Sequence, residues 1–82
     1  MSEKAMRMLK HMRGQLRMQE TRDASAQSAA RSIGVKPEAI EFDGLVDELL
    51  QAGYIQSYRS PSLTAHGLYR LTDRGIAAAE EG

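Results

Sequence analysis

Cysteine is absent from this 82-residue chain, which excludes a disulfide framework, a thiolate nucleophile and a cysteine-ligated zinc site. Long apolar runs are missing as well. The longest one, Ile76–Ala79, is far shorter than the roughly 20 residues that span a membrane. Arg7, Lys10 and Arg13 interrupt any apolar signal-peptide segment near the beginning. We therefore expect a soluble cytoplasmic protein without a membrane partner.

Recognisable catalytic motifs are also lacking. The sequence contains no nucleophile elbow and no glycine-rich phosphate-binding loop. His11 and His66 fall on different predicted elements and share no metal-ligand spacing. Asp43 and Asp47, one helical turn apart, have the spacing for a divalent cation, but such exposed pairs are usually only solvated. We expect neither an enzyme nor a cofactor or metal site.

The chain has no net charge, yet its two halves differ strongly. Hydrophobic residues make up 41% and charged residues 27%, which is typical of a globular protein, and the length predicts one domain over residues 1–82. Residues 1–36 carry eight Lys or Arg against three acids, and residues 37–82 carry three against eight. The resulting charges of +5 and −5 indicate candidate interaction surfaces.

Residues 2 to about 20 show the periodicity of a first helix. Its apolar face consists of Ala5, Leu9, Met12 and Leu16. A basic stripe adjoins this face and consists of Arg7, Lys10, Arg13 and Arg17. Met6 and Met18 project elsewhere and suit either a dimer seam or gaps in a small core. The basic stripe is either a contact surface or a solvated helix face.

Two further helices are predicted downstream. Asp23 is the expected N-cap of a helix over Ala24–Ile33, with Ala26, Ala29, Ala30 and Ile33 on its apolar face and Gly34 behind it. Pro37 is the expected first residue of the third helix, whose buried face consists of Phe42, Leu45, Val46, Leu49 and Leu50. Gly53 ends this helix.

The last third of the chain has the pattern of two strands and a capped helix. Strands are predicted over Tyr54–Arg59 and Leu68–Leu71, with a turn at 60–62 and a hairpin tip over 63–67. Thr72 and Asp73 begin a last short helix that continues over Ile76–Glu81. A short extra strand between the first and second helices is a further expectation.

This order of elements resembles a winged helix-turn-helix domain of the broad MarR-like and PadR-like type. The best-matching residues are Leu45, Val46, Leu49, Gly53, Leu71, Thr72 and Gly75, the last of which the resemblance places in a tight turn within the final helix. The resemblance implies an α+β fold with a three-helix core, a C-terminal β-hairpin wing and a short last helix. It also implies a small transcriptional regulator that binds double-stranded DNA.

The candidate nucleic-acid contacts lie before the third helix and on the wing. They are Arg31, Lys36, Arg59, Ser60, Ser62, Thr64, His66 and Arg70. Cations and hydroxyls on a turn and a hairpin suit contacts to the phosphate backbone, although most polar loops make none. No basic residue occurs between Pro37 and Tyr58, so the third helix departs from the usual base-reading pattern.

Protein interaction is the alternative function. The third helix presents Ile40 among acidic residues, a pattern typical of a small contact patch with a charged rim, or simply of a solvated face. Its candidate residues, together with those of the first helix, are Met6, Arg7, Lys10, Ile40, Asp43 and Asp47. The partner in this interpretation is a second copy, giving a homodimer, or another protein, and DNA is not bound.

Overall fold

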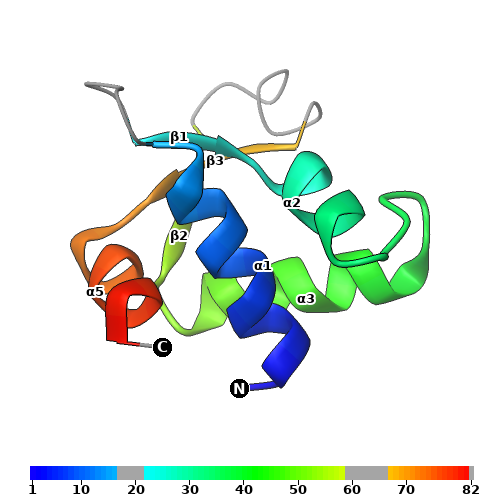
Figure 1. Ribbon diagram of the computed structural model, residues 1–82, viewed down its shortest axis with the longest axis horizontal. Coiled ribbons are helices and arrows are strands. Elements are labelled where there is room, and N and C mark those ends of the chain that lie inside the picture. Colours follow the sequence, from blue (N-terminus) through cyan, green and yellow to red (C-terminus); the bar gives the residue numbers. More distant parts are fainter. Residues whose placement is uncertain (17–21, 59–66, 82) are drawn as a thin grey trace.

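The computed structural model describes residues 1–16, 22–58 and 67–81 of the chain. The elements follow in the order α1 (Glu3–Gly14), β1 (Asp23–Ser25), α2 (Ala26–Ser32), α3 (Ile40–Gln51), β2 (Ile55–Ser57), β3 (Leu68–Leu71) and α5 (Asp73–Glu81). Among the described residues the fold is α+β, with four helices and a three-stranded antiparallel sheet (Figure 1). None of these helices is long and apolar enough to cross a membrane.

A single apolar core lies between the helices and one face of the sheet. α1 contributes four fully buried side chains, and α3 contributes four buried ones, of which only Leu49 has no exposed surface, from the face that its periodicity predicts. The small residues Ala26, Ala29 and Ala30 form the buried face of α2, which allows α1 to pack closely against it. Leu50 and Ile33, predicted as core, are only half-buried at its edge.

β3 is the central strand of the sheet, because the strand order is β1-β3-β2. The register aligns Ala24, Tyr69 and Ser57 across the sheet, and it aligns Ile55 with Leu71. Directly opposed residues point to the same face, so Tyr69, Leu71 and Ile55 all face the core. β1 is the expected extra strand between the first two helices.

The first two helices are shorter than predicted. α1 ends at Gly14, not near residue 20, because Gln15 leaves the helix and binds the backbone of Ser25. Its side-chain oxygen accepts from the Ser25 N–H at 2.8 Å, and its amide donates to the Ser25 carbonyl at 3.0 Å. α2 begins after Ser25 instead of Asp23, since residues 23–25 pair with β3, and the Ser25 hydroxyl accepts from the Ser28 N–H at 3.1 Å.

The third helix was predicted to begin at Pro37, and that start is wrong. Pro37 and Glu38 lie in a turn that the Ala39 N–H closes by donating to the Lys36 carbonyl at 3.0 Å, and α3 begins at Ile40. β2 covers Ile55–Ser57 of the predicted strand, whose last residue, Arg59, lies outside the described residues. β3 has the predicted bounds.

One polar junction ties the end of α3 to the beginning of α5. Gly53 has the left-handed φ of +76° that follows a helix, and its carbonyl accepts from the Thr72 hydroxyl at 2.6 Å. The same hydroxyl oxygen accepts from the Gly75 N–H at 3.0 Å and so caps α5. Gly75 lies in the first turn of a regular helix against the Tyr54 carbonyl, so the predicted tight turn is wrong; glycine is needed there for close approach.

Candidate functional site

Two of the predicted cations meet at the turn between α2 and α3. Arg31 and Lys36 are both exposed and line one shallow hollow of about 360 Å³. The turn is well held, because the Gly34 N–H donates to the Arg31 carbonyl and the Val35 N–H to the Ala30 carbonyl, at 3.1 and 2.9 Å. Glu38 also lines the hollow, so its formal charge is +1. The hollow is therefore lined by two positively charged side chains on a hydrogen-bonded turn.

The beginning of α3 lies beside this hollow. Its N-cap residue, Ala39, makes no side-chain cap hydrogen bond. Backbone N–H groups at a helix N-terminus carry partial positive charge, and Glu41 and Asp43 lie in the same first turn of α3. The sequence could not show that Arg31 and Lys36 share one hollow, because that depends on the path of residues 33–39.

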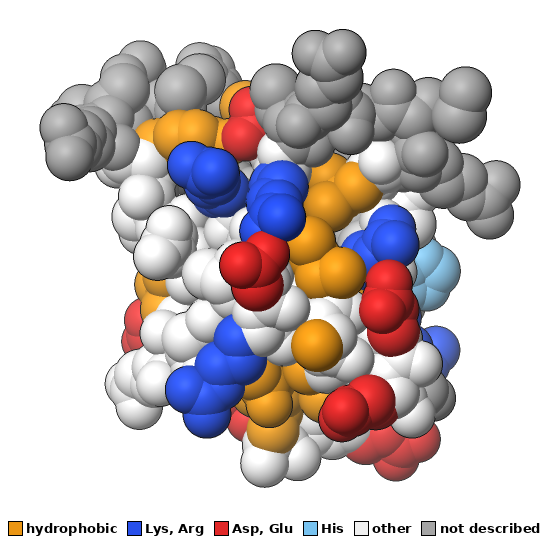
Figure 2. Space-filling view, turned by 90° about the vertical axis from the view of Figure 1, so that its left-hand side faces the viewer, with side chains coloured by type: hydrophobic (Ala, Val, Ile, Leu, Met, Phe, Trp, Pro, Cys, Tyr) orange, Lys and Arg blue, Asp and Glu red, His pale blue; other side chains and the backbone are white. Residues whose placement is uncertain are grey.

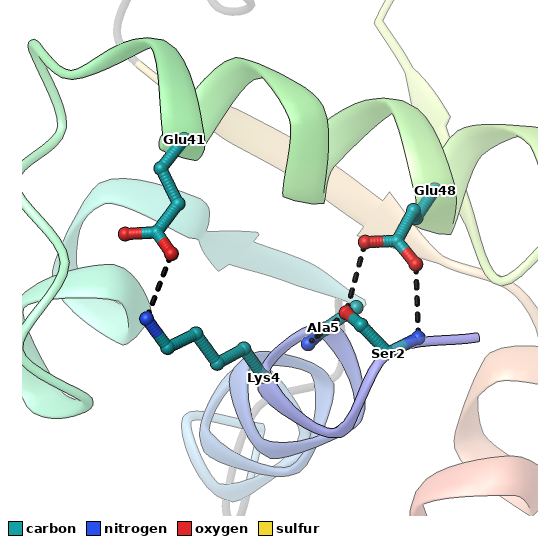
Figure 3. Close-up of polar contacts among 5 residues, drawn as sticks. All are labelled: Ser2, Lys4, Ala5, Glu41 and Glu48. Atoms are coloured by element: carbon teal, nitrogen blue, oxygen red, sulfur yellow. Dashed lines mark hydrogen bonds and ion pairs between the residues drawn. The ribbon is translucent and has the colours of Figure 1, made fainter.

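Two of the four acidic side chains of α3 are engaged by the beginning of α1 (Figure 3). Glu48 accepts from the Ser2 backbone N–H and from the Ser2 hydroxyl, both at 2.9 Å. Glu41 pairs with Lys4 at 2.7 Å. Sequence patterns did not reveal these contacts, because the partners Ser2 and Lys4 lie far away in the chain.

The other two acids, Asp43 and Asp47, remain exposed on the outward face of α3 with Ile40 and Gly44. Ile40 is 89% exposed, as the sequence predicts. Burial raises the pKa of Tyr69 on β3, and the negative charges of Asp43 and then Asp47 raise it further. The outward face of α3 thus carries negative potential and, over its described length, no basic side chain.

Arg70 lies apart from the α2–α3 turn, on β3. It is exposed on the side of the sheet that faces away from the core, and Asp23 and Gln56 lie opposite it in the register. The remaining wing candidates lie outside the described residues; they are Arg59, Ser60, Ser62, Thr64 and His66. The described part of the chain therefore brings together only Arg31 and Lys36 of the predicted nucleic-acid contacts.

The basic stripe of α1 is partly used within the fold. Arg13 pairs with Glu80 of α5 at 3.1 Å, while Arg7 is exposed, and Lys10 and Met6 are half-buried. Met6 packs against the core, which favours the core-filling interpretation over a dimer seam. Arg17 and Met18 lie outside the described residues.

The side of the molecule on which α5 lies has mixed charge. Figure 2 shows Lys or Arg and Asp or Glu side chains interleaved there around apolar atoms. α5 contributes an ion pair between Arg22 and Asp73, and the Arg74 guanidinium lies 5.9 Å from the centre of the Tyr54 ring. This side has no single-sign patch among the described residues that would attract a polyanion.

No group of three or more His, Cys, Asp or Glu in the described residues could hold a metal ion. Comparisons of the chain with protein-family models, with curated proteins and with solved structures found no match.

The Ser2–Glu48 contact predicts a loss of stability in acid. The backbone and then the side-chain hydrogen bond from Ser2 hold the pKa of Glu48 below its ordinary value. The pKa of a Glu side chain in the unfolded chain is about 4.3, and the native pKa of Glu48 is lower. At pH values above the unfolded pKa the ionised Glu48 therefore stabilises the fold, and this contribution is lost as the pH falls through the native pKa. We expect Glu48→Gln to flatten the pH dependence of the urea midpoint below about pH 5.

The matched control for this prediction is Glu81→Gln, which removes an exposed carboxylate at the end of α5. Both variants are compared with the unmodified chain by urea unfolding from pH 3 to 7. If the urea midpoint of Glu48→Gln falls with decreasing pH as steeply as that of the unmodified chain, Glu48 does not contribute to the loss of stability in acid.

Proposed function

We propose that this chain is a winged helix-turn-helix regulator that binds double-stranded DNA through its phosphate backbone. The observation that carries the proposal is the shared hollow of Arg31 and Lys36 at the α2–α3 turn, beside the uncapped beginning of α3. Guanidinium and ammonium groups beside the beginning of a helix are suited to binding a phosphate.

The arrangement of the described elements supports the same proposal. Helix, strand, two helices, two strands and a last helix follow one another, and the sheet order is β1-β3-β2. The sequence resemblance implies three helices followed by a hairpin and a short helix, which agrees with this order. The segment between β2 and β3, where the wing would lie, falls mostly outside the described residues.

The chemistry of α3 defines what kind of DNA binding is proposed. Its outward face offers Ile40, two aspartates, Gly44 and Gln51 in place of the Arg, Lys and Asn that usually read base edges. Two carboxylates near phosphates repel them. Binding is therefore led by backbone contacts, with a steep salt dependence and weak discrimination between sequences.

Fluorescence anisotropy with a mixed-sequence duplex at several salt concentrations tests this function. Each phosphate contact contributes about 0.9 to the slope of log K against log salt, so Arg31→Ala with Lys36→Ala should lower that slope by about 1.8. We expect the double variant to bind at least about tenfold more weakly at low salt. The control is Arg7→Ala, which removes an exposed cation of α1 that does not line the hollow.

Two results would oppose the proposal. Absence of binding by the unmodified chain at low salt would end it. The control removes one charge and the double variant two, so a loss in log affinity only twice as large in the double variant would show that net charge, and not the α2–α3 hollow, accounts for the binding.

A further inference from the structure

The outward face of α3 carries side chains that the fold itself does not use. It consists of Ile40, Asp43, Gly44, Asp47 and Gln51, all of them exposed. Asp43 and Asp47 make no ion pair with another described residue, in contrast to Glu41 and Glu48 on the same helix. Nothing lies within 4 Å of the position that a Gly44 Cβ would occupy, and its φ is not left-handed. A glycine inside a helix weakens it, so Gly44 has no explanation within the monomer.

The outward face of α1 repeats this spacing in reverse. Read from the end of the helix, it consists of Gly14, His11, Lys10, Arg7 and Glu3, with intervals of three, one, three and four residues. The α3 face has the same intervals read forwards. Gly14, like Gly44, has open space at its Cβ position and an ordinary helical φ.

We propose that α3 of one copy packs antiparallel on α1 of a second copy. In this register Ile40 lies over Gly14 and Asp47 faces Arg7, while Asp43 lies on the side of Lys10 and Gly44 on the side of His11. Gln51 then faces Glu3 and donates its amide to the carboxylate, and His11 lies across the space that Gly44 leaves. Each glycine therefore admits a larger side chain.

This self-association does not rest on DNA binding. It needs a second molecule, because within one copy the buried faces of α1 and α3 meet in the core and their outward faces point into solvent. Each helix has only 12 residues. The buried area would fall at the low end for specific complexes, below about 1,200 Å², so the association is weak and transient.

Sedimentation equilibrium without DNA, at protein concentrations up to about 1 mM, tests the proposal. Asp47→Arg and Arg7→Asp each place like charges at the same contact, and each should weaken association at least tenfold. An equimolar mixture of the two variants should restore association, because position 47 of either variant then meets a residue of opposite charge at position 7 of the other variant. Glu81→Arg makes the same charge change as Asp47→Arg outside this face and should associate like the unmodified chain.

The variant Gly44→Ala distinguishes an effect on the packing between two copies from an effect on the stability of a single copy. Alanine should raise the melting temperature of the dilute monomer and at the same time weaken association, because the added Cβ fills the space opposite His11. The proposal is overturned if the unmodified chain stays monomeric over the whole range, or if the mixture of charge variants associates no better than each alone. Far-UV circular dichroism of the two charge variants, Asp47→Arg and Arg7→Asp, distinguishes a loss of association from a loss of helical structure.

Discussion

Replacing Gly75 with alanine is expected to lower the free energy of unfolding by about 3 kcal/mol or more, at the upper end of overpacking effects. A Cβ at this position would overlap the Tyr54 carbonyl oxygen and lie 2.8 Å from the carbonyl carbon and 3.1 Å from the Cα. These are backbone atoms, so no side-chain rotation relieves the overlap.

The surrounding hydrogen bonds make the displacement costly. The Tyr54 carbonyl accepts from the Thr72 N–H at 3.1 Å, and the neighbouring Gly53 carbonyl accepts from the Thr72 hydroxyl. Moving α5 away from residue 54 would stretch both bonds and the cap on Gly75. At about 4–8 °C per kcal/mol for a domain of this size, we expect the melting temperature to fall by more than 10 °C.

Gly44→Ala, measured by the same thermal unfolding in dilute solution, is the matched control. It makes the same chemical change in the middle of α3, where the Cβ meets open space, and should stabilise the fold by up to about 1 kcal/mol. If the two alanine variants melt within a few degrees of each other, the close approach of α5 to residue 54 is not as described.

Leu71→Ala is expected to cost about 3 kcal/mol, within the usual range for a fully buried leucine. Leu71 has no exposed surface and lies on the central strand, opposite Ile55 and beneath the helices. Truncation leaves a cavity between β3 and the core, and the paired strands on either side limit its collapse. Urea unfolding measures the loss as a lower midpoint.

Leu68→Ala on the same strand is the control. Leu68 is only half-buried and opposes Ser25, so its truncation should cost about 1 kcal/mol or less. A similar cost for both variants would contradict the placement of Leu71 in the core and Leu68 at the margin.

Local signals predicted much of this fold. The apolar faces of α1 and α3 follow from helical periodicity, and Gly34 and Gly53 follow from the need for a left-handed residue behind a helix, where their φ angles are +78° and +76°. Thr72 was identifiable as a cap because a hydroxyl precedes the last helix.

Contacts between distant segments account for what the sequence left open. β1 forms because it pairs with β3, and α1 ends where the Gln15 side chain hydrogen-bonds to the Ser25 backbone. Pro37 suits the first turn of a helix, yet the chain uses it in the preceding turn. The exposure of Ile40 was predictable from helical phase, whereas the shared hollow of Arg31 and Lys36 needed the three-dimensional path of the turn.

The strand order has a consequence for how the molecule comes to be folded during synthesis. β3 is translated after both of its neighbours, so β1 and β2 have only unpaired edges until Leu71 has emerged from the ribosome. α1 and α2 can form turns early, but the sheet cannot grow stepwise from the first strand. Closing the long loop from β1 to β3 slows folding. Until β3 is present, the unpaired backbone groups of β1 and β2 can pair with other chains. Assembly of this domain is therefore a single late event, and a nascent chain stalled before β3 is its most aggregation-prone form.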